Sequence, residues 1–155
     1  MFDVKPITSP IEQDCGATCM AMLLDYYGDP VTVADMNKEC NIKINGTSAK
    51  DLMNVGRKHG LDMRCFKMDT EELSKQDRPA IVWWKYSHFC MFCGMDEAGK
   101  IVVCNPDKGL YRMSKGLFNA FYSGIAIFNG EPHDIDDNGG TEDEHDRLEN
   151  QAVEP

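Results

Sequence analysis

The sequence of 155 residues lacks the patterns that direct a chain into a membrane or through one. It has no uninterrupted run of 18 apolar residues, which a membrane-spanning helix requires. Its first nine residues lack the apolar core of a secretory signal peptide. Its seven cysteines are odd in number and scattered, unlike the disulfide framework of a secreted domain. We therefore expect reduced thiols, a cytoplasmic location and no membrane span.

Positive charge is also scarce, with 16 basic against 26 acidic side chains. The excess lies at one end: residues 129–155 hold ten acidic side chains and one basic, whereas residues 1–128 are nearly neutral. So acidic a segment, poor in apolar residues, cannot bury enough surface to offset its ordering entropy. We predict a folded domain at 1–128 and a disordered acidic tail at 129–155, which aids solubility or contacts a basic partner. Neither part has a basic patch, so we expect no nucleic-acid ligand.

The hydrophobic periodicity changes along the chain from that of helices to that of strands. Helical spacing and capping residues predict helices or helical turns over residues 15–27, 31–40, 47–58, 69–73 and 114–122. Short runs rich in β-branched and aromatic residues predict strands over residues 63–68, 79–84, 88–94, 101–104 and 125–128. Helices followed by consecutive antiparallel strands indicate the α+β class, with the N-terminal helices packed on the sheet.

One cysteine lies where a polar segment turns into an apolar helix. Cys15 stands between Asp14 and Gly16, directly before the run that ends at Gly28. At a helix N-terminus the unpaired backbone N–H groups and the macrodipole favour thiolate over thiol. Thiolate is the form that attacks carbonyl carbons. The sequence therefore offers Cys15 as a candidate catalytic nucleophile.

Such a nucleophile needs a general base and a group that orients the base. His88 opens a predicted strand directly after a polar turn, so its ring can reach a cleft. Asn105 ends the next strand, where Pro106 stops the ladder and holds the preceding residue extended. An amide there can accept a hydrogen bond from His88, and Asp107 is the alternative orienting residue.

Four segments in this order resemble the bacteriocin-processing, double-glycine leader peptidases of the papain-like superfamily. They are DCGATCMAMLLDYYG (14–28), PAIVWW (79–84), HFCMF (88–92) and NPDKG (105–109). The resemblance covers roughly residues 5–128. It implies a papain-like cysteine peptidase fold, with Cys15 as nucleophile, His88 as general base and acid, and Asn105 as orienting residue. It further implies cleavage after small residues, Gly-Gly above all, in a peptide or leader substrate, without a cofactor.

The sequence departs from that family pattern in three ways. The family usually has an oxyanion Gln six residues before the cysteine, where this chain has Ser9, and Gln13 is the nearby candidate in its place. The family usually has Asp where Asn105 stands. No transporter follows the domain, so we expect a stand-alone peptidase that acts with a separate peptide exporter.

Other functions remain open at this point. Loss of a side-chain oxyanion donor typically lowers the rate about 100- to 1000-fold, so a weak or inactive peptide-binding module that uses the same cleft is the first alternative. An isopeptidase or acyltransferase on the same triad is another. Cys90 and Cys93 lie near His88, but residues three apart on a strand point to opposite faces. We therefore expect no metal site there.

Overall fold

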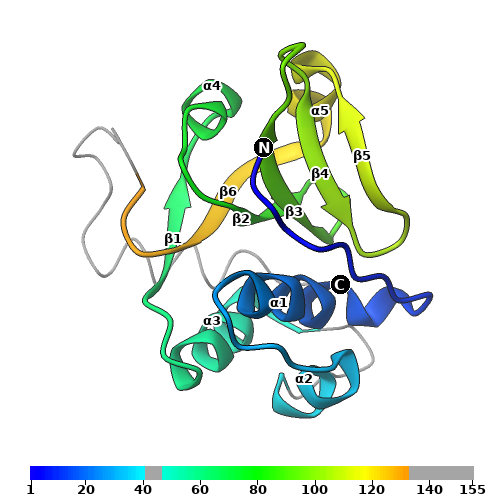
Figure 1. Ribbon diagram of the computed structural model, residues 1–155, viewed down its shortest axis with the longest axis vertical. Coiled ribbons are helices and arrows are strands. Elements are labelled where there is room, and N and C mark those ends of the chain that lie inside the picture. The colour runs from blue at the N-terminus through cyan, green and yellow to red at the C-terminus, as the bar shows by residue number, and fades with distance from the viewer. Residues whose placement is uncertain (41–46, 133–155) are drawn as a thin grey trace.

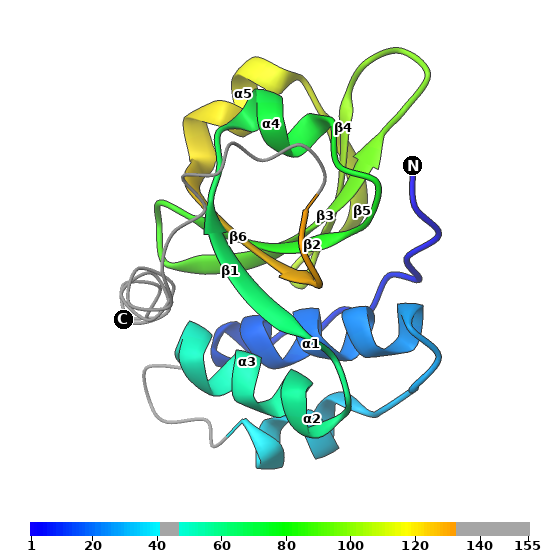
Figure 2. The same cartoon turned by 90° about the vertical axis from the view of Figure 1, so that its left-hand side faces the viewer.

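The computed structural model describes residues 1–40 and 47–132, which form a curved sheet with helices on both faces (Figures 1 and 2). The helices are η1 (Glu12–Asp14, a 3-10 turn), α1 (Cys15–Tyr26), α2 (Val33–Glu39), α3 (Ala49–Lys58), α4 (Thr70–Ser74) and α5 (Lys115–Phe121). The strands are β1 (Met63–Lys67), β2 (Ala80–Trp84), β3 (His88–Met95), β4 (Ile101–Asn105), β5 (Gly109–Met113) and β6 (Tyr122–Asn129).

The described strands form one six-stranded antiparallel sheet in the order β1-β6-β2-β3-β4-β5. Strands β2 to β5 follow one another as a meander, and β6 returns across the sheet to lie between β1 and β2. This arrangement confirms the α+β class. The meander matters for the site, because it brings the start of β3 beside the end of β4.

The sheet is buried on both faces, by two different sets of helices. Helices α1 and α3 pack against one face, and α4 and α5 cover the other, as Figure 2 shows edge-on. Side chains alternate accordingly along β2: Trp83 packs with the α1 core, and Trp84 with the core under α5. One tryptophan therefore belongs to the interior next to α1, and the other can line a cavity on the opposite face.

Short polar side chains begin the helices at the positions that the sequence pattern indicates. Thr32, Ser48, Asp69 and Ser114 each accept a hydrogen bond from the backbone N–H three residues later. Each cap satisfies one backbone N–H that the helix itself leaves unpaired. Helix α1 has no such side-chain cap, since η1 runs directly into it.

Two parts of the secondary structure differ from the sequence-based prediction. Strand β5 was missed because it lies at the edge of the sheet and follows a turn-rich segment. The side chains of Leu110 and Tyr111 lie on opposite faces of the sheet, and both are only partly buried. Strand β6 begins at Tyr122 rather than at residue 125, because Gly124 adopts a φ of 93° inside the strand and reads in sequence as a turn. The remaining predicted elements are confirmed within a few residues of their ends.

The boundary of the predicted acidic tail falls where β6 ends. Gly130 donates to the carbonyl of Asp62 at 2.8 Å, and Glu131 forms an ion pair with Arg64 at 2.9 Å. Residues 133–155, most of the predicted tail, lie outside the described residues. Within residues 1–40 and 47–132, every helix is too short or too polar to span a bilayer.

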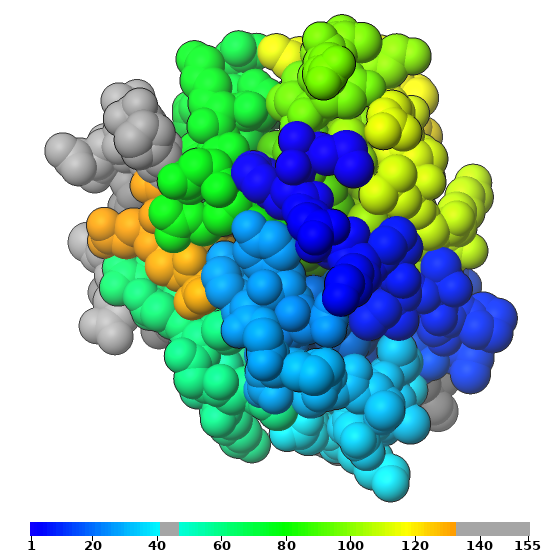
Figure 3. Space-filling model, in the orientation of Figure 1, coloured from blue at the N-terminus to red at the C-terminus, as the bar shows by residue number. Residues whose placement is uncertain are grey.

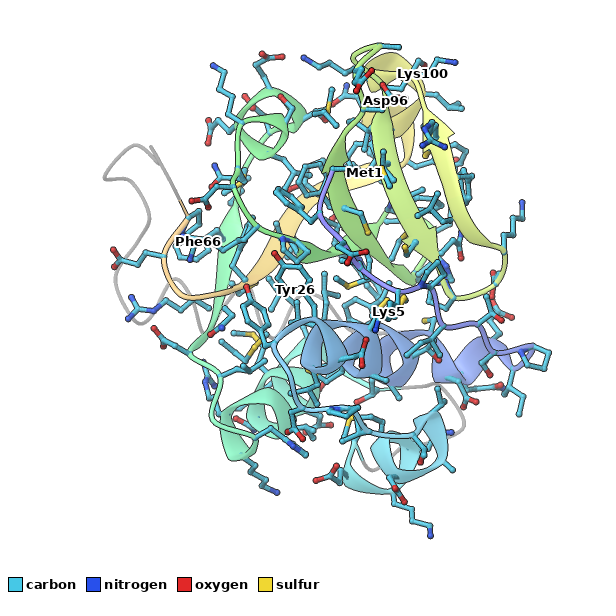
Figure 4. The ribbon with its side chains drawn as sticks, viewed as in Figure 1. Met1, Lys5, Tyr26, Phe66, Asp96 and Lys100 are labelled. Atoms are coloured by element: carbon cyan, nitrogen blue, oxygen red, sulfur yellow. The ribbon has the colours of Figure 1, made fainter. Side chains whose placement is uncertain are left out.

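The first ten residues cross the molecule from the sheet to η1 on its surface (Figure 3). In Figure 4, Met1 lies over the sheet and Lys5 lies near the helical layer. Backbone hydrogen bonds fasten both ends of this segment: Phe2 donates to Cys93 at 2.8 Å, and Ser9 donates to Pro106 at 2.9 Å. The segment therefore positions η1 and Cys15 at the end of the sheet where β3 begins and β4 ends.

Candidate active site

Cys15 is the first residue of α1, and it lies in the core between α1 and the sheet. Because Gly16 has no side chain, the start of α1 can pack closely against β3. A Cβ on Gly16 would lie 2.7 Å from Cγ2 of Thr47, 3.0 Å from Leu52 and 3.2 Å from the ring of Phe89. Because Phe89 directly follows His88 on β3, the start of α1 packs at the point where β3 begins.

His88 and Asn105 are brought together by the pairing of β3 with β4. Met91 lies opposite Cys104 in the antiparallel pair, so the first residue of β3 and the last residue of β4 lie at the same end of these two strands. Nε2 of His88 lies 2.9 Å from Oδ1 of Asn105. The His88 side chain is 13% exposed and Asn105 is 4% exposed. The pair is therefore enclosed, with the second imidazole nitrogen left for another partner.

The amide of Asn105 makes contacts at both of its ends. Oδ1 also accepts a hydrogen bond from the backbone N–H of Asp107 at 2.9 Å. Nδ2 donates to the hydroxyl of Tyr111 on β5 at 3.1 Å. The carboxylate of Asp107 is 47% exposed, and its nearer oxygen lies 3.9 Å from Nε2 of His88. Asn105 is thus the direct partner of the imidazole, and Asp107 is a more distant charge.

A cavity of about 520 Å³ opens beside the His88–Asn105 pair. The polar side of this cavity includes His88, Asn105 and Tyr111, and its apolar side includes Trp84, Leu117 and Phe121. The ring of Trp84 lies 5.8 Å from that of His88 and stacks on Phe121 at 5.3 Å. The cavity can therefore hold a ligand with apolar groups close to the imidazole.

The two residues considered for the oxyanion donor occupy different environments. Ser9 is buried, its hydroxyl donates to Oδ2 of Asp14 at 2.9 Å, and it also accepts from the backbone N–H of Ile11 at 3.3 Å. Gln13 lies on η1 with an exposed side chain. Gln13, two residues before Cys15, is thus exposed at the surface, whereas Ser9 is buried.

Two of the other thiols, Cys90 and Cys93, lie in settings that disfavour thiolate, whereas a hydrogen bond with Cys93 lowers the pKa of Cys104. No disulfide links the seven cysteines, all of which fall within the described ranges. Burial raises the pKa of the Cys90 thiol well above its usual value. A hydrogen bond with Cys104, together with burial, raises the pKa of Cys93. Cys90 and Cys93 belong to the cores on opposite faces of the sheet, and no cluster of metal-binding side chains occurs in residues 1–40 and 47–132.

Sequence reasoning missed Tyr111, which contacts the candidate orienting residue. Its strand was not predicted, so nothing placed its hydroxyl near Asn105. The available signal was the turn at residues 105–109, followed by alternating side chains in GLYRM, which together are typical of a hairpin.

Comparisons with known proteins give one consistent answer. The chain is 28% identical over 130 residues to the lactococcin-G-processing and transport ATP-binding protein LagD of Lactococcus lactis subsp. lactis. It is 21% identical over 114 residues to the colicin V secretion/processing ATP-binding protein CvaB of Escherichia coli. These matches cover 80% and 74% of this chain, but the chain spans only 18% and 16% of those relatives.

Two solved structures share the fold. A double glycine motif protease from an AMS/PCAT transporter, in complex with the leader peptide, is 25% identical, with a TM-score of 0.76 over 81% of this chain and 90% of that one. The peptidase domain of Streptococcus ComA is 24% identical, with a TM-score of 0.74 over 81% of this chain and 96% of that one. The similarity to these peptidase domains confirms the papain-like α+β fold.

The model of the peptidase C39 family matches residues 3–133. This range takes in η1, all five α-helices and all six strands of the described residues, together with Cys15, His88 and Asn105. With peptidase domains as its structural neighbours, the chain belongs to the peptidase C39 family and is a cysteine peptidase.

Proposed function

We propose that this domain cleaves a peptide bond after a Gly-Gly pair in a leader peptide, through a triad of Cys15, His88 and Asn105. The observation that carries the triad is the 2.9 Å contact between Nε2 of His88 and Oδ1 of Asn105, at the edge where α1 packs on β3. Since Nε2 is engaged by the amide, Nδ1 is the nitrogen available to the Cys15 thiol.

The chemistry follows from these roles. His88 takes the thiol proton at Nδ1, and the sulfur of Cys15 attacks the carbonyl carbon of the scissile bond. His88 then returns the proton to the leaving amine as the C–N bond breaks, and a thioester remains. Water, deprotonated by His88, attacks the thioester carbonyl; the C–S bond breaks, the acid product leaves, and His88 returns the proton to the sulfur of Cys15. Asn105 accepts from Nε2–H throughout and stabilises the imidazolium without taking the proton.

The oxyanion that forms in each step needs hydrogen-bond donors. We infer that the backbone N–H of Cys15 supplies one and that the side-chain amide of Gln13 supplies the second. The exposure of Gln13 supports this role, since its side chain is not held by the core. Ser9 is a poorer candidate, because its hydroxyl hydrogen is donated to Asp14.

The cavity beside the triad supports a leader peptide as the substrate. Its wall of Trp84, Leu117 and Phe121 suits apolar side chains of an extended or helical peptide. Glycines at the scission point would let the peptide backbone approach a nucleophile that is only 2% exposed. The similar double glycine motif protease was solved with a leader peptide.

We infer a cytoplasmic domain whose partner is a peptide exporter. The relatives LagD and CvaB are described as processing and transport or secretion proteins, and this chain matches less than a fifth of each. A peptidase that acts on the cargo of an exporter removes the leader on the side where the peptide is made.

A weak or inactive peptide-binding module is the second candidate, and one observation favours it. The hydroxyl of Ser9, at the position where the resemblance expects an oxyanion Gln, donates to Asp14 instead of facing a substrate. Such a module would bind the leader in the same cavity and leave it intact.

One experiment separates the two candidates. The full chain is incubated with a synthetic leader peptide that ends in Gly-Gly and continues for several residues, and the products are identified by mass spectrometry. We expect cleavage after the second glycine by the wild type and none by Cys15→Ala, which should still bind the peptide. Binding without cleavage by the wild type would establish the binding module, and cleavage elsewhere would contradict the proposed specificity.

A further inference from the structure

The indole ring of Trp84 packs beside the imidazole of His88. The two residues lie directly opposite each other in the register of β2 and β3, so their side chains stand on the same face of the sheet. Their ring centroids lie 5.8 Å apart, with an angle of 57° between the ring planes. The imidazole therefore contacts the indole as well as the amide of Asn105, whose Oδ1 lies 2.9 Å from Nε2.

Trp84 is itself held in place. Its indole stacks on the ring of Phe121, with 5.3 Å between the centroids and 25° between the planes. Only 8% of Trp84 is exposed, although it lines the cavity beside the proposed triad. His88 borders the same cavity of about 520 Å³, so its ring has open space into which it can turn. Trp84 is thus a fixed wall next to a ring that is free to rotate on its other side.

The indole is destabilising in one respect. Its Nε1–H is buried and has no hydrogen-bond partner among residues 1–40 and 47–132. A buried donor without an acceptor lowers the stability of the folded state. A phenylalanine at this position would stack on Phe121 and fill most of the same space without that donor. The contact of the larger ring with His88 gives a reason for the indole that fold stability does not.

We infer that Trp84 is a positioning residue, whose indole holds the imidazole of His88 in the orientation in which Nε2 faces Asn105. This role rests on the proposed triad. There, Nδ1 must meet first the thiol of Cys15 and then the leaving amine, while Nε2–H stays on the amide oxygen. A ring that turns toward the cavity between these two transfers loses one partner or the other, and small displacements of a reacting group lower rates strongly.

The first test observes the hydrogen bond of His88 without turnover. A Cys15→Ala chain is labelled with nitrogen-15, and NMR measures how fast the Nε2–H of His88 exchanges its hydrogen with water. We expect Trp84→Phe, made in this chain, to speed the exchange at least about tenfold while circular dichroism shows an unchanged fold. An exchange rate equal to that of the parent chain would overturn the inference, and so would a parent chain in which Nε2–H is not protected.

Trp83→Phe is the matched control. Trp83 is the neighbouring residue on β2, it is also 8% exposed, and its ring packs on Phe89 on the opposite face of the sheet. The control removes the same atoms from the interior and should leave the exchange rate of the His88 proton unchanged. An equal acceleration in both variants would show a general loosening of the sheet and would contradict a specific role of Trp84.

The second test uses the active chain. Trp84→Phe should lower kcat for the double-glycine peptide at least about tenfold. It should also slow the alkylation of Cys15 by iodoacetamide, a small reagent that does not depend on the peptide-binding wall. A rise in KM alone, with alkylation unchanged, would make Trp84 only a substrate contact and would contradict the positioning role. A wild type that cleaves nothing would refute the proposed function, whereas the exchange rates would still decide the role of Trp84.

Discussion

Ser9 and Asp14 are joined by a buried hydrogen bond of 2.9 Å that ends one residue before the candidate nucleophile. Through its backbone N–H, Ser9 is also bound to Pro106, the residue after Asn105. Ser9 therefore connects the segment that carries Cys15 with the turn that carries the orienting amide. Ser9 occupies the position at which we expect an oxyanion donor from the family resemblance, so we expect the rate of cleavage to depend on which residue stands there.

Replacing Ser9 by the residue of the resembling family should raise the rate. Ser9→Gln places a side-chain amide at the expected oxyanion position in addition to the donor proposed from Gln13, and one such donor is worth about 100- to 1000-fold. We expect kcat for the double-glycine peptide to rise by at least about tenfold, because the lost bond to Asp14 offsets part of the gain. The measurement is steady-state cleavage. Ser9→Ala is the control, with kcat within about threefold of the wild type; a larger drop there would make Ser9 itself the donor.

Asn105 and Asp107 should differ in their effect on catalysis. Asn105→Ala removes the contact at 2.9 Å and should lower kcat about 100-fold. Asp107→Ala removes a carboxylate at 3.9 Å that is half exposed, and should lower kcat less than about threefold. Both variants are assayed with the same peptide and checked for folding by circular dichroism. If Asp107→Ala is the more damaging change, the orienting role belongs to the carboxylate.

Gly16 should tolerate no side chain. The Cβ of Gly16→Ala would meet side-chain atoms of Thr47, Leu52 and Phe89 at 2.7 to 3.2 Å, so either these side chains or the start of α1 must shift. We expect a loss of about 1–3 kcal/mol in the free energy of unfolding, measured by urea denaturation. Gly116→Ala is the matched control on α5, where a Cβ meets nothing within 4 Å. It should stabilise by about 0.5–1 kcal/mol, and equal effects at both sites would contradict the packing.

His59 should make stability depend on pH. Its Nδ1 lies 2.7 Å from Asp29 and its Nε2 lies 3.0 Å from Glu39, and these contacts raise the pKa of His59 above its usual 6.5. The stabilisation is therefore complete below pH about 6.5 and is lost as the pH rises through the raised pKa of the folded state.

The measurement is urea unfolding of the wild type and of His59→Gln between pH 5.5 and 9. The difference between them should be largest at low pH and shrink as the pH rises. A difference that grows with pH would show that His59 is not held as an imidazolium by Asp29 and Glu39.

Removal of residues 133–155 should leave folding and cleavage nearly unchanged. We propose that the folded domain ends with the contacts of Gly130 and Glu131, and residues 133–155 carry nine acidic side chains against one basic. The truncated chain should melt within about 2 °C of the full chain and be less soluble, since repulsion between molecules decreases. A larger fall in Tm would mean that the acidic segment packs on the domain.

The sequence predicted those parts of the fold that local patterns encode. Helices with a capping residue, such as the one after Ser48, and strands with continuous apolar runs, such as 79–84, were found within a few residues. The edge strand β5 was missed because its side chains are only partly buried and its pattern is weak. Whether a short run joins a sheet depends on its neighbour, here β4, which local sequence does not specify.

The same limit applies to the site. His88 and Asn105 could be paired in advance, because adjacent strands of a hairpin meet at one edge. The hydroxyl of Tyr111 could not, since it reaches Asn105 across the strand that was missed. The bond between Ser9 and Asp14 arises from the turn at η1, whose shape no side-chain periodicity encodes.

The most direct test of the triad is the relative rate at which the seven cysteines react. The full chain is treated with limiting iodoacetamide at pH about 6.5, and each thiol is quantified by mass spectrometry in the wild type and in His88→Ala. Cys15 is 2% exposed and the other six are fully buried, and a thiolate reacts where a thiol does not. We predict that Cys15 reacts at least tenfold faster than any other cysteine, and that His88→Ala removes this preference. Faster labelling of Cys40, Cys65 or Cys104, or a Cys15 rate that does not respond to His88→Ala, would contradict the triad.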